Sequence, residues 1–97
     1  MDVGHTVRIN EDPIEAMKQC ASRLYEFHIK DVTAPTAQGK PTEVGRGVID
    51  IVAVLKELLA LKWPYHVALE YEANGEDPMP GMIESYAYIR GVLAAVA

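Results

Sequence analysis

Polar and apolar side chains alternate, as they do in a β-strand, in the sequence Tyr25-Glu26-Phe27-His28-Ile29-Lys30-Asp31. The predicted fold is built around this strand. The apolar face of the predicted strand consists of Tyr25, Phe27 and Ile29. The opposite face consists of Leu24, Glu26, His28 and Lys30, most of which are ionisable. The stretch therefore predicts a strand with one face suited to a core and the other suited to a polar site.

Two further stretches repeat this arrangement. In His66-Val67-Ala68-Leu69-Glu70-Tyr71-Glu72 the apolar face is Val67, Leu69 and Tyr71, and the opposite face is His66, Ala68, Glu70 and Glu72. Met1-Asp2-Val3-Gly4-His5 predicts the tail of a third strand, which again ends in a carboxylate and an imidazole. Each of the three predicted strand ends therefore carries a side chain of a type that binds metal ions.

Composition restricts the class of protein. The chain has 97 residues, a formal net charge of −5 and a single cysteine, Cys20, which we predict to be a buried thiol. No apolar run approaches the ~20 residues of a spanning helix, and no signal peptide is visible, so we expect one cytoplasmic domain over residues 1–97. The acidic balance offers a nucleic acid no general electrostatic attraction, and small polar substrates are better candidates.

Helical patterns separate the predicted strands. Asp12-Pro13, with Glu15 at the capping-box spacing, predicts a helix that runs to about Ser22. Asp50 predicts the N-cap of a second helix that ends near Lys62. We expect this helix to bury Ile51, Val54, Leu55, Leu58, Leu59 and Leu61. A last helix, from about Met82 to Val96, presents Ile83, Tyr86, Ile89, Leu93 and Val96.

Alternation of strands with helices predicts a parallel sheet. Val32 to Gly47 and Ala73 to Gly81 are read as the loops that follow two of its strands. A polar sheet face suits the mouth of a closed barrel, where catalytic groups lie at the carboxyl ends of the strands. A (β/α)8 TIM barrel needs ~250 residues, so the chain predicts only its last three β/α units and is incomplete in isolation.

Asp2, His28 and Glu70 form the candidate metal site. If they end adjacent parallel strands, a spacing of ~4.8 Å brings their tips within reach of one divalent cation, such as Mn²⁺, Mg²⁺, Zn²⁺, Co²⁺ or Fe²⁺. Taken alone, His28 is better explained as a hydrogen-bonded core histidine. An inward Glu70 without a partner would be costly, which favours the metal reading.

Other polar residues have two readings. His5 is a substrate contact or a solvated loop residue, and Lys30 and Arg46 either neutralise a phosphate or an enediolate or are solvated. Gly45-Arg46-Gly47 is a weak phosphate-binding signal, since glycines also serve in turns. We read His66, at the entry end of its strand, as a structural or surface residue. Tyr71 and Trp63 are read as packing residues.

The sequence resembles the C-terminal part of the sugar phosphate isomerase/epimerase family, the xylose isomerase-like TIM barrels. Asp2-Val3-Gly4-His5 is similar to that family's Asp-x-Gly-His segment, and His28-Ile29-Lys30-Asp31 to its His-x-Lys-Asp strand. Gly45-Arg46-Gly47-Val48-Ile49-Asp50 resembles its Gly-x-Gly-x-x-Asp loop, and Leu69-Glu70-Tyr71 its last-strand glutamate. These motifs follow one another in the family's order.

The resemblance implies that Asp2, His28 and Glu70 are three of four metal ligands. It also implies that Glu70 is an acid/base residue and that His5 contacts the substrate, a sugar or cyclitol. The family's further glutamate ligand and first five units have no counterpart here, so we expect a fragment or a second chain that supplies them, and possible self-association. Sugar (phosphate) isomerisation or epimerisation through an enediolate is the expected reaction. The alternatives are keto-inositol (inosose) dehydration, or a non-catalytic remnant or interaction module.

Overall fold

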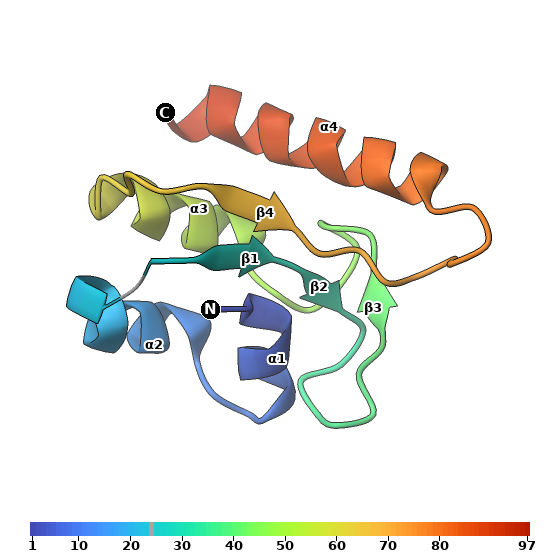
Figure 1. Ribbon diagram of the computed structural model, residues 1–97, viewed down its shortest axis with the longest axis horizontal. Coiled ribbons are helices and arrows are strands. Elements are labelled where there is room, and N and C mark those ends of the chain that lie inside the picture. Colours follow the sequence, from blue (N-terminus) through green and yellow to red (C-terminus); the bar gives the residue numbers. More distant parts are fainter. Residues whose placement is uncertain (24) are drawn as a thin grey trace.

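The computed structural model describes residues 1–23 and 25–97, so the predicted place of Leu24 lies outside the described residues. Figure 1 shows helices on both sides of a central pair of strands, with α4 above them and α1 and α2 below. In chain order the elements are α1 (Val3–Arg8), α2 (Pro13–Cys20), the 3-10 helix η1 (Ala21–Arg23), β1 (Phe27–Ile29), β2 (Asp31–Val32), β3 (Pro41–Thr42), α3 (Ile51–Ala60), β4 (Val67–Leu69) and α4 (Met79–Val96).

The central strands are parallel, as predicted. β1 pairs with β4, and His28 lies opposite Ala68. On the other edge of β1, Asp2 forms a parallel bridge with His28, and the His28 N–H donates to the Met1 carbonyl at 2.7 Å. Three parallel segments therefore lie side by side in chain order. Within residues 1–23 and 25–97 these segments form a mixed α/β arrangement and do not close into a barrel.

The first segment is shorter than predicted. Extended backbone ends at Asp2, and Val3-Gly4-His5 begins helix α1 instead of continuing the strand. The Asp2 side chain accepts a hydrogen bond from the His5 N–H at 3.0 Å, which is the standard way to satisfy a free amide at a helix start. The N-terminal prediction was therefore correct for Asp2 and wrong for His5, which belongs to a helix.

The core lies between β1 and helices α1, α2 and α3. Phe27 and Ile29 are each 1% exposed, as the strand pattern predicted, and each such burial contributes about 1.5–3 kcal/mol. Tyr25 and Val67 were predicted to share the buried face, but they are 65% and 40% exposed. Tyr25 packs edge-on against Tyr65 at the surface, and among the described residues β4 has a neighbouring strand, β1, on one edge only.

Two of the predicted helix starts are confirmed. Asp12 accepts from the Ile14 N–H at 2.9 Å, and Asp50 accepts from the Ala53 N–H at 3.0 Å. Cys20, however, is exposed at the end of α2, so the prediction of a buried thiol was wrong. Leu59 also lies on the exposed side of α3.

Helix α4 begins at Met79, three residues before the predicted start, and buries small residues rather than large ones. Its fully buried positions are Gly81 and Ser85, while Ile83 and Tyr86 are exposed. A Cβ at Gly81 would lie 2.0 Å from the Tyr71 hydroxyl oxygen, so the glycine allows the helix to approach that ring. The apolar stripe predicted for this helix was therefore wrong at Ile83 and Tyr86.

The predicted loop after β1 contains the antiparallel pair β2–β3 and is organised by Asp31. This carboxylate is completely buried, and both of its oxygens accept backbone N–H groups. Oδ1 accepts from Val32 at 2.9 Å and Ile49 at 3.2 Å, and Oδ2 accepts from Gly45 at 2.9 Å and Gly47 at 3.0 Å. One side chain thus fixes the path of the chain from β1 to α3.

We predict that Asp31→Asn lowers the free energy of unfolding by about 3 kcal/mol or more, because an amide nitrogen would face backbone donors and the charged acceptor would be lost. Urea unfolding followed by Trp63 fluorescence measures this change. The matched control is Asp50→Asn, which removes the same charge and leaves an equally good N-cap, so its cost should be small. Equal effects of the two substitutions would contradict the role given to Asp31.

Candidate metal and substrate site at the strand ends

His28 and Glu70 lie on one face of the parallel pair, at the carboxyl ends of the strands. The His28 Nδ1 atom is 3.4 Å from the Glu70 Oε1 atom, and both side chains are partly exposed. Ala68, the residue paired with His28, has a small side chain on this face. On its other side the His28 Nε2 atom lies 3.8 Å from the exposed Glu26 carboxylate. The structure therefore brings together two of the three predicted metal ligands.

Asp2 is next to this pair along the sheet but is also engaged in capping α1. Its Oδ1 accepts the His5 N–H, and its Oδ2 lies 3.9 Å from the His5 Nε2 atom. The carboxylate is mostly buried, with 14% of its side chain exposed, whereas His5 is 63% exposed. Asp2 and His5 thus form a second pair beside the first.

The donor types fit a divalent cation only in part. An imidazole nitrogen and a carboxylate oxygen are suitable ligands for Mn²⁺, Zn²⁺ or Co²⁺, and His28 and Glu70 supply them at adjoining positions. Among residues 1–23 and 25–97, no three His, Cys, Asp or Glu side chains are arranged to hold a metal ion. His28 and Glu70 would be two ligands, whereas the Asp2 carboxylate caps α1.

Lys30 is buried, contrary to the reading of a solvated loop residue. Its side chain is 1% exposed and its ammonium group forms an ion pair with Glu72, which lies two residues beyond Glu70. The Lys30 side chain passes directly over Gly4. A Cβ at Gly4 would lie only 2.7 Å from the Lys30 Cδ atom, so a larger residue at this position would clash with the lysine. The hydrogen bond and charge of Lys30 lower the pKa of Glu72, and the more distant His5 and Arg8 add to this effect.

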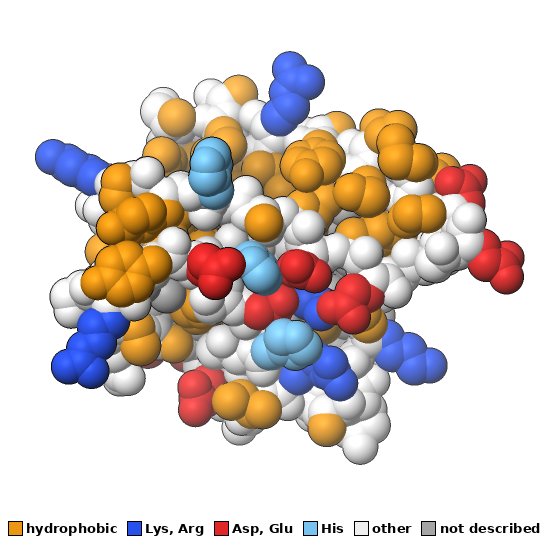
Figure 2. Space-filling view, viewed as in Figure 1, with side chains coloured by type: hydrophobic (Ala, Val, Ile, Leu, Met, Phe, Trp, Pro, Cys, Tyr) orange, Lys and Arg blue, Asp and Glu red, His pale blue; other side chains and the backbone are white. Residues whose placement is uncertain are grey.

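Figure 2 shows that acidic and histidine side chains gather at the centre of one face, with hydrophobic side chains around them. We call this surface the polar belt. Its members, as the ion pairs define them, are Asp2, His5, Glu26, His28, Lys30, Glu70 and Glu72. His66, which was read as a structural or surface residue, is exposed.

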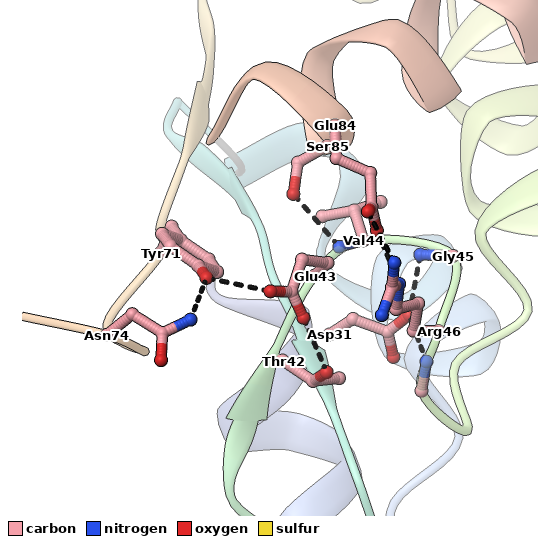
Figure 3. Close-up of polar contacts among 11 residues, drawn as sticks. Asp31, Thr42, Glu43, Val44, Gly45, Arg46, Tyr71, Asn74, Glu84 and Ser85 are labelled. Carbon is pink, nitrogen blue, oxygen red and sulfur yellow. Dashed lines mark hydrogen bonds and ion pairs between the residues drawn. The ribbon is translucent and has the colours of Figure 1, made fainter. Parts of the chain in front are cut away.

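Arg46 belongs to a different cluster. Its guanidinium forms a bidentate ion pair with Glu84 of α4, in which Nε and Nη2 are each 2.6 Å from a carboxylate oxygen. Gly45 and Gly47, the glycines of the weak phosphate signal, direct their N–H groups to Asp31. Figure 3 shows Arg46 beside Asp31 and Glu84. The structure thus assigns this loop a role in linking α4 to the sheet.

Tyr71 and Glu43 form a hydrogen-bonded pair that the sequence did not reveal. The Tyr71 hydroxyl donates to Glu43 Oε1 at 2.9 Å and accepts from the Asn74 amide at 2.9 Å (Figure 3). A hydrogen bond from its own backbone and one from Tyr71 lower the pKa of Glu43, whereas burial and the carboxylate raise the pKa of Tyr71. The prediction that Tyr71 is only a packing residue therefore missed its polar contact.

Comparison with known proteins places the chain in a family. The family model described as xylose isomerase-like TIM barrel matches residues 1–92. The chain belongs to the xylose isomerase-like TIM barrel family. This superfamily includes sugar isomerases and epimerases, and metal dependence is common in it. No curated protein matches the chain significantly. Within the described part of the chain, no helix has the length and apolarity needed to cross a membrane.

We predict that Glu43 makes the stability of the chain depend on pH. Because its folded-state pKa lies below the ordinary value of 4.5, its contribution is present above that value and is lost as the pH falls through the folded-state pKa. As the pH is lowered from 7 to about 3, the free energy of unfolding of Glu43→Gln should therefore decrease less than that of the wild type. Urea titrations at several pH values measure the difference.

The control for this experiment is Glu76→Gln, which changes an exposed glutamate of the loop before α4. It should follow the wild type across the whole pH range. Tyr71→Phe should reproduce part of the Glu43→Gln effect, because it removes one of the hydrogen bonds that lower the pKa. A Glu43→Gln profile parallel to the wild type would contradict the prediction.

Proposed function

We propose that the chain is the C-terminal part of a metal-dependent sugar isomerase or epimerase that works through an enediolate. The observation that carries the proposal is the approach of His28 and Glu70 to 3.4 Å at adjacent parallel strand ends, in a chain of this family. In TIM barrels the carboxyl ends of the strands carry the catalytic groups. The polar belt would then face the inside of the barrel mouth.

In this proposal His28 and Glu70 hold the cation, together with Asp2, and Glu70 also moves a proton. When bound, a divalent cation polarises adjacent carbonyl and hydroxyl oxygens and stabilises the negative charge that develops on them. Glu70 lies beside the histidine and is partly exposed, which supports its proposed role as the base that removes a proton from a substrate carbon and returns it. The resemblance requires a second glutamate, from outside this chain, on the other face of the substrate.

His5 and Lys30 have supporting roles in the proposal. His5 is exposed next to Asp2 and can donate to or accept from a substrate hydroxyl. Lys30 is the buried cation of the belt and holds Glu72 in place through their ion pair. Arg46 was considered as a substrate contact from the sequence, but its bidentate pair with Glu84 supports a structural role.

In this proposal the remaining β/α units of the barrel come from the same chain or from another chain. The outer edge of β4 has no neighbour in the described residues, and Val67 on that strand is exposed. Met79, Ile83 and Tyr86 form an exposed apolar stripe along α4. Between α3, β4 and α4 lies a groove of about 400 Å³ whose lining includes Leu55, Leu58, Trp63, Ile89 and Leu93. These apolar surfaces support further β/α units, or self-association where such units are lacking.

We predict that the chain binds Mn²⁺ and that His28→Ala and Glu70→Gln each weaken this binding by about tenfold or more, since each removes a direct ligand. Isothermal titration calorimetry and the electron paramagnetic resonance signal of free Mn²⁺ both measure the affinity. The control is Glu76→Gln, which changes an exposed glutamate in the loop before α4. It should bind as the wild type does.

Two results would count against the proposal. Absence of Mn²⁺, Zn²⁺ and Co²⁺ binding by the folded chain would favour the non-catalytic interaction module. Equal loss in the Glu76→Gln control would show that binding does not depend on the strand-end pair. Inosose dehydration needs the same enolisation, so metal affinity does not distinguish it from isomerisation. An activity assay of a completed barrel with both types of substrate distinguishes the two reactions.

A further inference from the structure

We propose that Glu72 is a specificity-determining residue, which makes the polar belt accept the uncharged hydroxyl-bearing part of a substrate and reject a phosphate. This inference rests on the proposed function, because it names the substrate class of that same site. The sequence contains three features that would suit a phosphate: Lys30, Arg46 and the Gly45–Gly47 loop. In the structure each of them is already occupied by a carboxylate of the chain itself.

The first feature is the Lys30 ammonium. The buried side chain of Lys30 passes over Gly4 to reach Glu72, and the lack of a Cβ at Gly4 leaves the room that it needs. To bind a phosphate, the ammonium would have to give up a charge-assisted hydrogen bond, which is among the stronger polar contacts in proteins. Glu72 therefore neutralises the cation at the position where a substrate anion would use it.

The second and third features are neutralised in the same way. Arg46 presents its guanidinium to both oxygens of Glu84. Three N–H groups of the loop donate to Asp31 and so are not free to bind an anion. The donors are the backbone amides of Gly45, Gly47 and Ile49. An incoming phosphate would have to displace a buried carboxylate from these amides.

The excess of negative charge in the polar belt also disfavours a phosphate. Its carboxylates are Asp2, Glu26, Glu70 and Glu72, and its cation is Lys30. Arg8 adds a positive charge near Glu72, but it donates to the Ala37 carbonyl at 3.0 Å. Carboxylates accept hydrogen bonds from hydroxyl groups and repel phosphates. A neutral sugar or cyclitol therefore matches this surface better than a sugar phosphate does.

The test titrates the metal-free chain with inorganic phosphate in the presence of EDTA and follows backbone amide resonances. For the wild type we expect no saturable shifts at Lys30 or Glu72. For Glu72→Gln we expect saturable binding, about tenfold or more tighter than any wild-type response, because the Lys30 ammonium then lacks its carboxylate. The double variant Glu72→Gln/Lys30→Met should lose this gain.

Glu76→Gln is the matched control, since it makes the same change in net charge outside the polar belt and leaves the Lys30–Glu72 pair intact. It should behave as the wild type does. Saturable phosphate binding at Lys30 in the wild type would overturn the inference, and so would an equal gain in Glu76→Gln. If Glu72→Gln fails to fold, Glu72→Ala replaces it, with the same expected gain. Because no metal is present, failure to bind Mn²⁺ would overturn the proposed function without changing this result.

Discussion

The acceptance of four backbone N–H groups by the Asp31 carboxylate is the interaction on which the arrangement of the chain depends. A buried carboxylate is costly unless it is fully hydrogen-bonded, and here the backbone supplies the donors. Two of them, from Gly45 and Gly47, come from a loop that no helix or strand would otherwise hold. A Cβ at Gly47 would lie 2.2 Å from the Asp31 Oδ1 atom, so this position requires glycine. The start of α3 and the approach of α4 follow from this loop.

Two neighbouring residues after β1, Lys30 and Asp31, have different functions on opposite sides of the sheet. Lys30 extends toward the polar belt and pairs with Glu72, while Asp31 extends toward the loop and the helices. Neighbouring residues of an extended chain point in opposite directions, so one dipeptide serves both sides of the sheet. The same geometry places His28 in the belt and Ile29 in the core. The structural and the chemical sides of the chain are thus separated by strand alternation.

Asp2 shows how closely the polar belt is linked to local folding. The same carboxylate ends the first parallel segment, caps α1 and lies beside His28 through the backbone bridge. A helix that starts directly after a strand end brings its free amides to the same edge as the strand-end side chains. His5 reaches the belt for this reason, from the first turn of a helix and not from a strand.

Local sequence was enough to predict the features that depend on neighbours in the chain. Strand alternation predicted that Phe27 would be buried and that His28 and Glu70 would share a face, and Asp12 and Asp50 marked helix starts through their side-chain acceptors. Tertiary structure alone decided which distant carboxylate each cation meets. Lys30 finds Glu72 across 42 positions, and nothing in a local pattern encodes such a pair.

The same reason explains the inward face of α4. Its buried positions are Gly81 and Ser85, which hydropathy ranks low, because Tyr71 and the Val44 N–H approach the helix there. Local periodicity reports the apolarity of a side chain, whereas burial depends on the space that other segments leave. The sequence therefore determined the parallel strands, the starts of α2 and α3 and the polar face. Packing between distant segments decided which groups on that face remain available to a ligand.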